Sequence, residues 1–176
     1  MDTLLQILIY LIPGLIIFLT TYVVLRAFLD REHKLRLIEF RQANIREALP
    51  IRLQAYERLT LFMERIALNN LLPRIRKSGM TVSEFRTALI SNIRMEYEHN
   101  LSQQVYVSAE AWASVKMAKE EVIGMINQHA LDLRPEADSV ELSKKMISFL
   151  ADSNEMTPTS KAIAQLKKDV MLLYER

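Results

Sequence analysis

The feature that most constrains this chain is a run of uncharged residues close to its start, from Thr3 to Leu25. As an α-helix the run covers roughly 34 Å, which matches the hydrocarbon core of a bilayer at about 30 Å. Most of its side chains are Leu, Ile, Val or Phe, which favour insertion into lipid. The sequence therefore predicts a transmembrane anchor in residues 1–25, with the span itself at about residues 3–25.

A cleaved signal peptide is the main alternative for this apolar run. Signal peptides begin with a positively charged region, have a shorter apolar core and end at a cleavage site of small residues. Here the N-terminus, Met1-Asp2-Thr3, contains no Lys or Arg, the apolar core is too long, and no Ala-x-Ala sequence follows it. We therefore expect an anchor that is retained in the mature protein.

Basic residues follow the apolar run, whereas a single acid precedes it. By the positive-inside rule, the chain after the run lies in the cytoplasm and a very short N-terminus lies outside. The basic residues predicted to lie nearest the lipid headgroups are Arg26, Arg31, Lys34 and Arg36. The alternative is an ordinary solvated surface that carries only the topology signal.

The composition of the remaining chain points to helices. Three glycines in 176 residues are too few for a sheet protein with many tight turns. The chain has no cysteine, which excludes disulfides, thiolate zinc sites and a cysteine nucleophile. We predict an all-α protein with a charged juxtamembrane neck helix at residues 26–49 and a small cytoplasmic helical bundle at residues 50–176.

Proline and capping residues divide the first half of the predicted bundle. Pro50 suits the first turn of a new helix, and the segment 69–73 is expected to end that helix. Thr81-Val82-Ser83-Glu84 matches a capping box, with Thr81 as the N-cap. The helix that it opens is expected to run to about Asn100.

The second half of the bundle is divided in the same way. Residues 104–107 are expected to be extended, and Ser108 is expected to cap the next helix. A further helix at about 137–151 would turn Val140, Ile147 and Leu150 inward, and Thr157-Pro158 would open the last one, with the inward positions Ile163, Leu166, Val170 and Leu173.

The sequence carries no recognisable catalytic signature. It contains no Gly-rich phosphate loop, no HExxH and no GxSxG, and its three histidines lie far apart in the chain. The basic cluster at residues 74–77 is short and has no interleaved aromatic residues, so it does not indicate nucleic-acid binding. We therefore predict a protein that is not an enzyme and binds no cofactor, metal or nucleic acid, and no small-molecule substrate is identified.

One stretch, residues 96–112, concentrates polar and aromatic side chains. It reads either as a hydrogen-bonded corner between two helices or as a docking surface for another protein. A third reading is an acid–base or metal set of Glu96, Glu98 and His99, because the i, i+3 spacing can place Glu96 and His99 on one face. Di-iron bundles use this ExxH spacing twice with two further glutamates, whereas EYEH occurs once here.

Two blocks of the chain resemble a known family. LPIRLQAYERLTLFMERI at residues 49–66 and EYEHNLSQQVYVSAEAW at residues 96–112, preceded by an N-terminal span, resemble uncharacterised single-pass membrane proteins of Bacteroidota. The resemblance covers most of the chain and implies a bacterial inner-membrane location. It implies no activity, cofactor or catalytic residue.

These observations predict a non-enzymatic scaffold or accessory subunit whose cytoplasmic domain docks onto a larger inner-membrane complex or self-associates. The contact residues that we expect are Arg52, Tyr56 and Arg58 on the first domain helix and His99, Gln103, Gln104 and Tyr106 at the corner. The alternatives are an enzyme or regulator with an unrecognised site near Glu96, Glu98 and His99, and a protein that binds anionic lipid through its basic neck.

Overall fold

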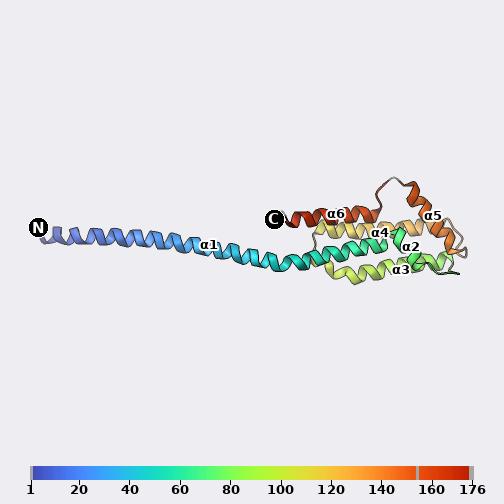
Figure 1. Cartoon of the computed structure of the whole chain (residues 1–176), viewed down its shortest axis with the longest axis horizontal. Coiled ribbons are helices and arrows are strands. Elements are labelled where there is room, and N and C mark those ends of the chain that lie inside the picture. The colour runs from blue at the N-terminus through green and yellow to red at the C-terminus, as the bar shows by residue number, and fades with distance from the viewer. Residues whose placement is uncertain (1, 154, 175–176) are drawn as a thin grey trace. The chain divides into compact units, whose positions relative to one another are not determined.

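In a computed structural model of the protein, the described backbone covers residues 2–153 and 155–174, and the side chains of residues 2–8, 10, 12 and 37–46 lie outside the description. The described backbone forms the helices α1 to α6 and a short 3-10 helix, η1, without a strand (Figure 1). The predicted all-α fold class is confirmed. The chain divides into two compact units, which we call the N-terminal segment, Met1–Leu49, and the helical domain, Pro50–Arg176.

Helix α1, Asp2–Ile66, begins in the N-terminal segment and ends in the helical domain. Within the described side chains, its section Pro13–Arg36 is long and apolar enough to cross a membrane, and none of that section is buried. The section overlaps the span predicted at residues 3–25. The predicted span residues 3–8, 10 and 12 lie outside the described side chains.

The prediction that Pro50 opens a new helix is wrong, because α1 continues through it. A proline inside a helix lacks a donor and crowds the preceding turn, at a cost of about 3 kcal/mol. The helix beyond Pro50 buries Leu59, Phe62 and Met63 almost completely. Burial of each such side chain contributes roughly 1.5–3 kcal/mol, which offsets the cost of the proline.

Four helical stretches form the core of the helical domain: α1 from Pro50 onward, α3 (Val82–Asn100), α4 (Ala109–Leu131) and α6 (Pro158–Tyr174). They alternate in direction along the chain, with α4 packed against both α3 and α6 (Figure 1). The side chains buried between them include Leu59, Phe62, Met63, Phe85, Leu89, Ile93, Val115, Ile126 and Leu166. This up-and-down arrangement places the start of α3 and the end of α1 at the same end of the bundle.

The segment 69–73 was predicted to end a helix, and this prediction is wrong. Ala67, whose ψ is 130°, interrupts the helical conformation after α1, and a short helix, α2 (Leu68–Ile75), follows directly. Leu68, Leu71 and Leu72 are buried and hold α2 against the bundle. Burial of this leucine cluster stabilises a helix that contains Pro73, which sequence rules read as a stop.

The predicted caps are confirmed. The N–H of Glu84 donates to the Thr81 hydroxyl at 3.2 Å, and the N–H of Thr81 donates to the Glu84 carboxylate at 2.9 Å. The N–H of Ala111 donates to the Ser108 hydroxyl at 3.0 Å. These bonds satisfy backbone donors that the first helical turn leaves free, so each helix begins where the sequence predicts.

The extended segment predicted at residues 104–107 is wrong for its first part. The helix η1, Leu101–Val105, follows α3 directly, and the N–H of Tyr106 donates to the carbonyl of Gln103 at 3.0 Å. Such 3-10 bonds tighten the last turn of a helix and use carbonyl groups that would otherwise lack partners. The chain therefore reaches Ser108 through a short 3-10 helix and a turn instead of an extended segment.

The inward face predicted for α5, Ser139–Asp152, is also wrong in part. Leu142 and Met146 are fully buried, whereas Ile147 is 54% exposed and Val140 is only half-buried. Leu150 does pack against the core, as predicted. The helix carries apolar residues on two adjacent stripes, and packing against α2, α3 and α4 decides which stripe is buried.

Candidate functional site

The corner, residues 96–108, lies at the Pro50 end of the helical domain and is held there by the first domain turns of α1. The Nε of Arg52 donates to the carbonyl of Tyr106 at 3.2 Å, and the N–H of Ser108 donates to the hydroxyl of Tyr56 at 3.3 Å. One turn further along α1, the Nη2 of Arg58 lies 3.2 Å from the Nε2 of His99. The structure thus brings the two predicted groups of contact residues together.

Tyr56 connects three elements from inside the domain. Its side chain is 2% exposed, and its hydroxyl donates to the Oδ2 of Asp169 on α6 at 2.9 Å while it accepts the bond from Ser108. Burial raises the pKa of Tyr56, the bond from the Ser108 backbone opposes this, and the Asp169 carboxylate adds to the increase. The hydroxyl therefore remains protonated and able to donate.

Two of the predicted contact residues are not available at the surface. Tyr56 is buried as described above, and Gln103 is only 8% exposed, with its amide donating to the Ser102 hydroxyl at 3.2 Å. Both side chains stabilise the corner from within. The prediction that they contact a partner at the surface is therefore corrected. Among the predicted contact residues, His99, Gln104 and Tyr106 are exposed, and Arg52 and Arg58 are half-buried.

Asp169 was missed by sequence reasoning. The predicted apolar positions of α6 include Leu166 and Val170, and Asp169 lies between them on the same side, 8% exposed. An acid on the apolar face of a helix is the signal that could have found it, because buried carboxylates are almost always paired. The Nε2 of Gln165 provides a second donor to it at 3.4 Å.

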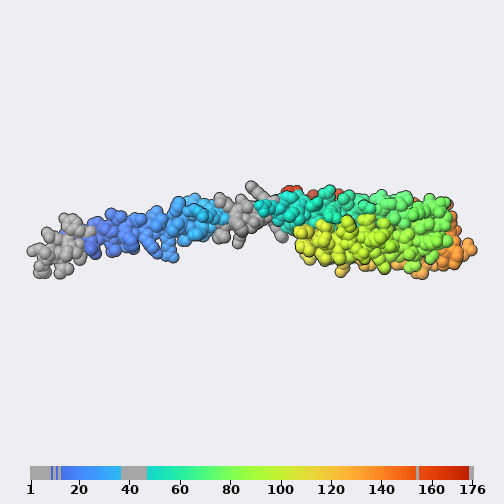
Figure 2. Space-filling model, turned by 90° about the horizontal axis from the view of Figure 1, so that it is seen from below, coloured from blue at the N-terminus to red at the C-terminus, as the bar shows by residue number. Residues whose placement is uncertain are grey.

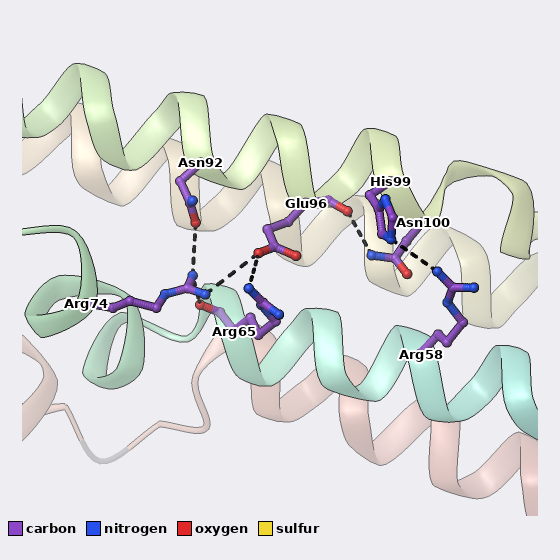
Figure 3. A network of polar contacts seen from close by, with 7 residues as sticks. All are labelled: Arg58, Arg65, Arg74, Asn92, Glu96, His99 and Asn100. Atoms are coloured by element: carbon purple, nitrogen blue, oxygen red, sulfur yellow. Dashed lines mark hydrogen bonds and ion pairs between the residues drawn. The ribbon is translucent and has the colours of Figure 1, made fainter.

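Glu96 is the centre of a polar network between α1, α2 and α3 (Figure 3). One carboxylate oxygen lies 2.8 Å from the Nη2 of Arg65 and 3.7 Å from the Nη1 of Arg74. Arg74 also donates to the Oδ1 of Asn92 at 2.9 Å and to the carbonyl of Arg65 at 3.0 Å. The network ties α2 to the bundle, since Arg74 is an α2 residue that bonds to both neighbouring helices.

This geometry separates the three residues of the predicted acid–base or metal set. The carboxylate of Glu96 faces Arg65 and Arg74, and the ring of His99 faces Arg58 (Figure 3). Glu98 is exposed. Within the part of the chain that the structure describes, no three His, Cys, Asp or Glu side chains gather in a way that could hold a metal ion.

The aromatic residues of the stretch divide into two kinds. Tyr97 stacks on Trp112 with ring centroids 5.6 Å apart and packs against Phe62 at 6.1 Å, while the Nζ of Lys119 lies 4.1 Å from the centre of the Tyr97 ring. These rings pack helices together. Tyr106, by contrast, is 42% exposed, so it is the corner aromatic that another molecule can reach.

Helix η1, which precedes Tyr106, carries two exposed apolar side chains. Val105 is 76% exposed and Leu101 is 42% exposed. We call the group formed by His99, Leu101, Gln104, Val105 and Tyr106 the corner surface. Figure 2 shows one face of the helical domain, on which α1 and α3, the two helices that hold the corner, lie side by side.

The four residues predicted to lie near lipid headgroups belong to the N-terminal segment. Arg26, Arg31, Lys34 and Arg36 are all exposed on α1. The Nη2 of Arg36 lies 2.6 Å from the Oε1 of Glu32, one helical turn away. Exposed pairs of this kind contribute about 0.3–0.5 kcal/mol, so the pair leaves the basic character of the segment largely intact.

The comparison with known proteins gives one result. A family model described as a family of unknown function, DUF7935, matches residues 2–173. No curated protein and no solved structure matches the chain.

Proposed function

From the premise that the chain belongs to DUF7935, a family of unknown function, we propose that it is a non-enzymatic, membrane-anchored scaffold or accessory subunit. Its helical domain docks onto a larger membrane complex or self-associates. The observation that carries the proposal is α1, which contains a section long and apolar enough to span a membrane and also supplies a core helix of the domain. An anchor raises the local concentration of such a domain at the membrane and so strengthens weak contacts.

The location that we propose is the bacterial inner membrane, with a single span, the short N-terminus outside and the helical domain in the cytoplasm. The support is the basic residues that follow the uncharged run Thr3–Leu25, namely Arg26, Arg31, Lys34 and Arg36, which the positive-inside rule places on the cytoplasmic side. The resemblance to single-pass membrane proteins of Bacteroidota agrees with an inner-membrane location.

The corner surface is the contact site that we propose for the scaffold role. It combines an aromatic ring, an amide, an imidazole and two apolar side chains, all exposed. Tyrosine is enriched among the residues that dominate binding energy, because its ring is large and rigid and its hydroxyl can bond. The corner is held by a bond from Arg52 to the Tyr106 carbonyl and a bond from the Ser108 N–H to the Tyr56 hydroxyl, so its shape exists before a partner binds, which lowers the entropic cost of binding.

A second role, attraction to anionic lipid, is favoured by one observation. Four exposed cations of the N-terminal segment, Arg26, Arg31, Lys34 and Arg36, follow the uncharged run Thr3–Leu25, and each cation close to an anionic leaflet contributes about 1 kcal/mol. Vesicle binding by the full chain would then weaken as salt is added, because screening acts on exposed charges. Binding that does not depend on salt or on anionic lipid contradicts this role.

The scaffold role is tested by purifying the full-length protein in a mild detergent and measuring what remains bound. We expect a stoichiometric partner or a defined homo-oligomer. The combined variant Gln104→Ala, Val105→Asp and Tyr106→Ala should reduce that assembly by about tenfold or more, which corresponds to 1.4 kcal/mol. Truncation of Tyr106 leaves its backbone carbonyl free to accept the Arg52 bond.

The matched control is Met117→Ala, which changes a side chain on α4 that is 60% exposed. It should leave the assembly unchanged. A monomer without any partner at every protein concentration contradicts the scaffold role. Equal loss in the control and in the corner variant contradicts the corner surface as its site.

A further inference from the structure

A groove of about 450 Å³ lies between α2 and α5, the helices at the end of the domain opposite to Pro50 (Figure 1). Its walls are apolar: Leu72 and Pro73 come from α2, and Val140 and Ile147 come from α5. Leu72 is buried, whereas Ile147 is 54% exposed. The groove is therefore open to solvent above an apolar floor.

The apolar lining explains the wrong prediction for α5. Val140 and Ile147 form the stripe that sequence reasoning turned inward, and the structure uses the neighbouring stripe, Leu142 and Met146, for the core. The stripe of Val140 and Ile147 lines the groove together with Leu72 and Pro73 of α2, and Ile147 remains 54% exposed. Its two residues are seven positions apart, or about 10 Å along the helix, which is the repeat that a helix lying alongside would meet.

The charge of the groove is one-sided. Its lining includes two exposed cations, Arg76 of the α2 C-cap and Lys144 of α5, and no acid. Neither cation forms an ion pair with a carboxylate among the described residues. Arg76 belongs to the basic cluster at residues 74–77, of which Arg74 is occupied by Glu96. The unpaired cations indicate a negatively charged occupant.

The packing of α5 beside the groove is also incomplete. Among the described residues, the hydroxyl of Ser143 is the buried side-chain polar atom that has no hydrogen-bond partner. A buried polar group without a partner costs about 1–3 kcal/mol. Ser143 is one of the groove-lining residues, and its buried hydroxyl lies beneath the surface that a partner would cover.

We propose that the α2–α5 groove binds an acidic amphipathic helix of a partner protein. Such a helix places apolar residues at i, i+3, i+4 and i+7 over Leu72, Val140 and Ile147, and its flanking carboxylates pair with Arg76 and Lys144. The site lies at the opposite end of the domain from the corner surface, so it goes beyond the scaffold role and does not depend on it.

The proposal is tested with the full-length protein in nanodiscs of zwitterionic lipid and two fluorescent peptides. Both peptides are about 18 residues long and carry leucine at i, i+3, i+4 and i+7; one has glutamate at the remaining positions and the other lysine. Fluorescence anisotropy should show saturable binding of the glutamate peptide, at least about tenfold tighter than the lysine peptide. Empty nanodiscs should bind both peptides much more weakly than the protein-containing nanodiscs bind the glutamate peptide.

Two variants locate the site. Ile147→Asp introduces a charge at an exposed position, so the fold should tolerate it, and it should weaken the glutamate peptide by about tenfold or more. The matched control, Met117→Asp on α4, is exposed to a similar degree and should bind as the unmodified protein does. Unfolding followed by Trp112 fluorescence verifies that both variants are folded.

The combined variant Arg76→Glu and Lys144→Glu tests the charge. It should reverse the preference, so that the lysine peptide becomes the tighter ligand. The proposal is overturned if the glutamate peptide shows no saturable binding, if Met117→Asp weakens binding as much as Ile147→Asp, or if charge reversal leaves the preference unchanged.

Discussion

Replacing Tyr56 by phenylalanine isolates the contribution of one buried hydroxyl to the helical domain. The ring stays in place, so no cavity forms, but the bond to Asp169 at 2.9 Å and the bond from Ser108 at 3.3 Å are both lost. A bond to a charged group contributes about 1.5–3 kcal/mol and a neutral one about 0.5–1.5 kcal/mol. Since Gln165 keeps a weak bond to the carboxylate, we expect the lower half of the summed range, about 2–3 kcal/mol.

The free energy of unfolding can be measured by urea titration of the full-length protein in detergent. Trp112 is the single tryptophan of the chain and stacks on Tyr97 inside the bundle, so its fluorescence reports unfolding of the helical domain. For a domain of this size, a loss of 2–3 kcal/mol corresponds to a fall in Tm of roughly 10 °C.

The matched control is Tyr106→Phe, because the Tyr106 side chain is exposed and the residue contacts Arg52 through its carbonyl only. It should change stability by less than about 0.5 kcal/mol. In the presence of Asp169→Ala, Tyr56→Phe should cost at least about 1 kcal/mol less than it does alone, because the two residues share one bond. Equal losses for the two tyrosine variants, or full additivity with Asp169→Ala, would refute the reasoning.

Three further predictions concern stability, each measured by the same urea titration. Glu96→Gln removes the charge between two arginines and should cost about 1–2 kcal/mol, between the values for exposed and buried pairs; a loss below 0.3 kcal/mol, as for many surface pairs, contradicts this. Gly79 has a φ of +81° and open space around its Cβ position, so Gly79→Ala should cost about 1 kcal/mol from backbone strain alone. Gly124 lies inside α4, and Gly124→Ala should stabilise the domain by about 0.5–1 kcal/mol. If both substitutions change the stability in the same direction, this reasoning is refuted. Burial, and then the charge of Lys145, lower the pKa of His129 in the folded protein. As the pH drops, this histidine is protonated in the unfolded chain before it is protonated in the folded one, so stability should fall from about pH 7 to about pH 5. His129→Gln should flatten this dependence, and an unchanged slope contradicts the prediction.

The parts of the fold that the sequence predicts well depend on contacts between near neighbours in the chain. The caps at Thr81 and Ser108 bond to groups three residues away, so their geometry follows from local sequence. Helix α3 has one clear apolar stripe, formed by Phe85, Leu89 and Ile93, and this stripe is fully buried. In both cases the distant parts of the chain do not alter the outcome.

The parts that the sequence does not predict depend on distant contacts. Tyr56 and Asp169 are 113 positions apart, and nothing near either residue indicates the other. For α5, two apolar stripes are equally plausible in the sequence, and the neighbouring helices choose between them. The same reason explains why Tyr56 and Gln103, which were predicted as contact residues at the surface, are buried.

The continuity of α1 has an evolutionary consequence. One helix supplies both the apolar section near the N-terminus and the wall of the core formed by Leu59, Phe62 and Met63. A gene rearrangement that replaced everything up to Ile66 would strip that wall away and unfold the domain. The exchangeable part of this protein therefore stops near Pro50, where the helical domain begins, and any replacement of the preceding segment has to leave residues 50–66 in place.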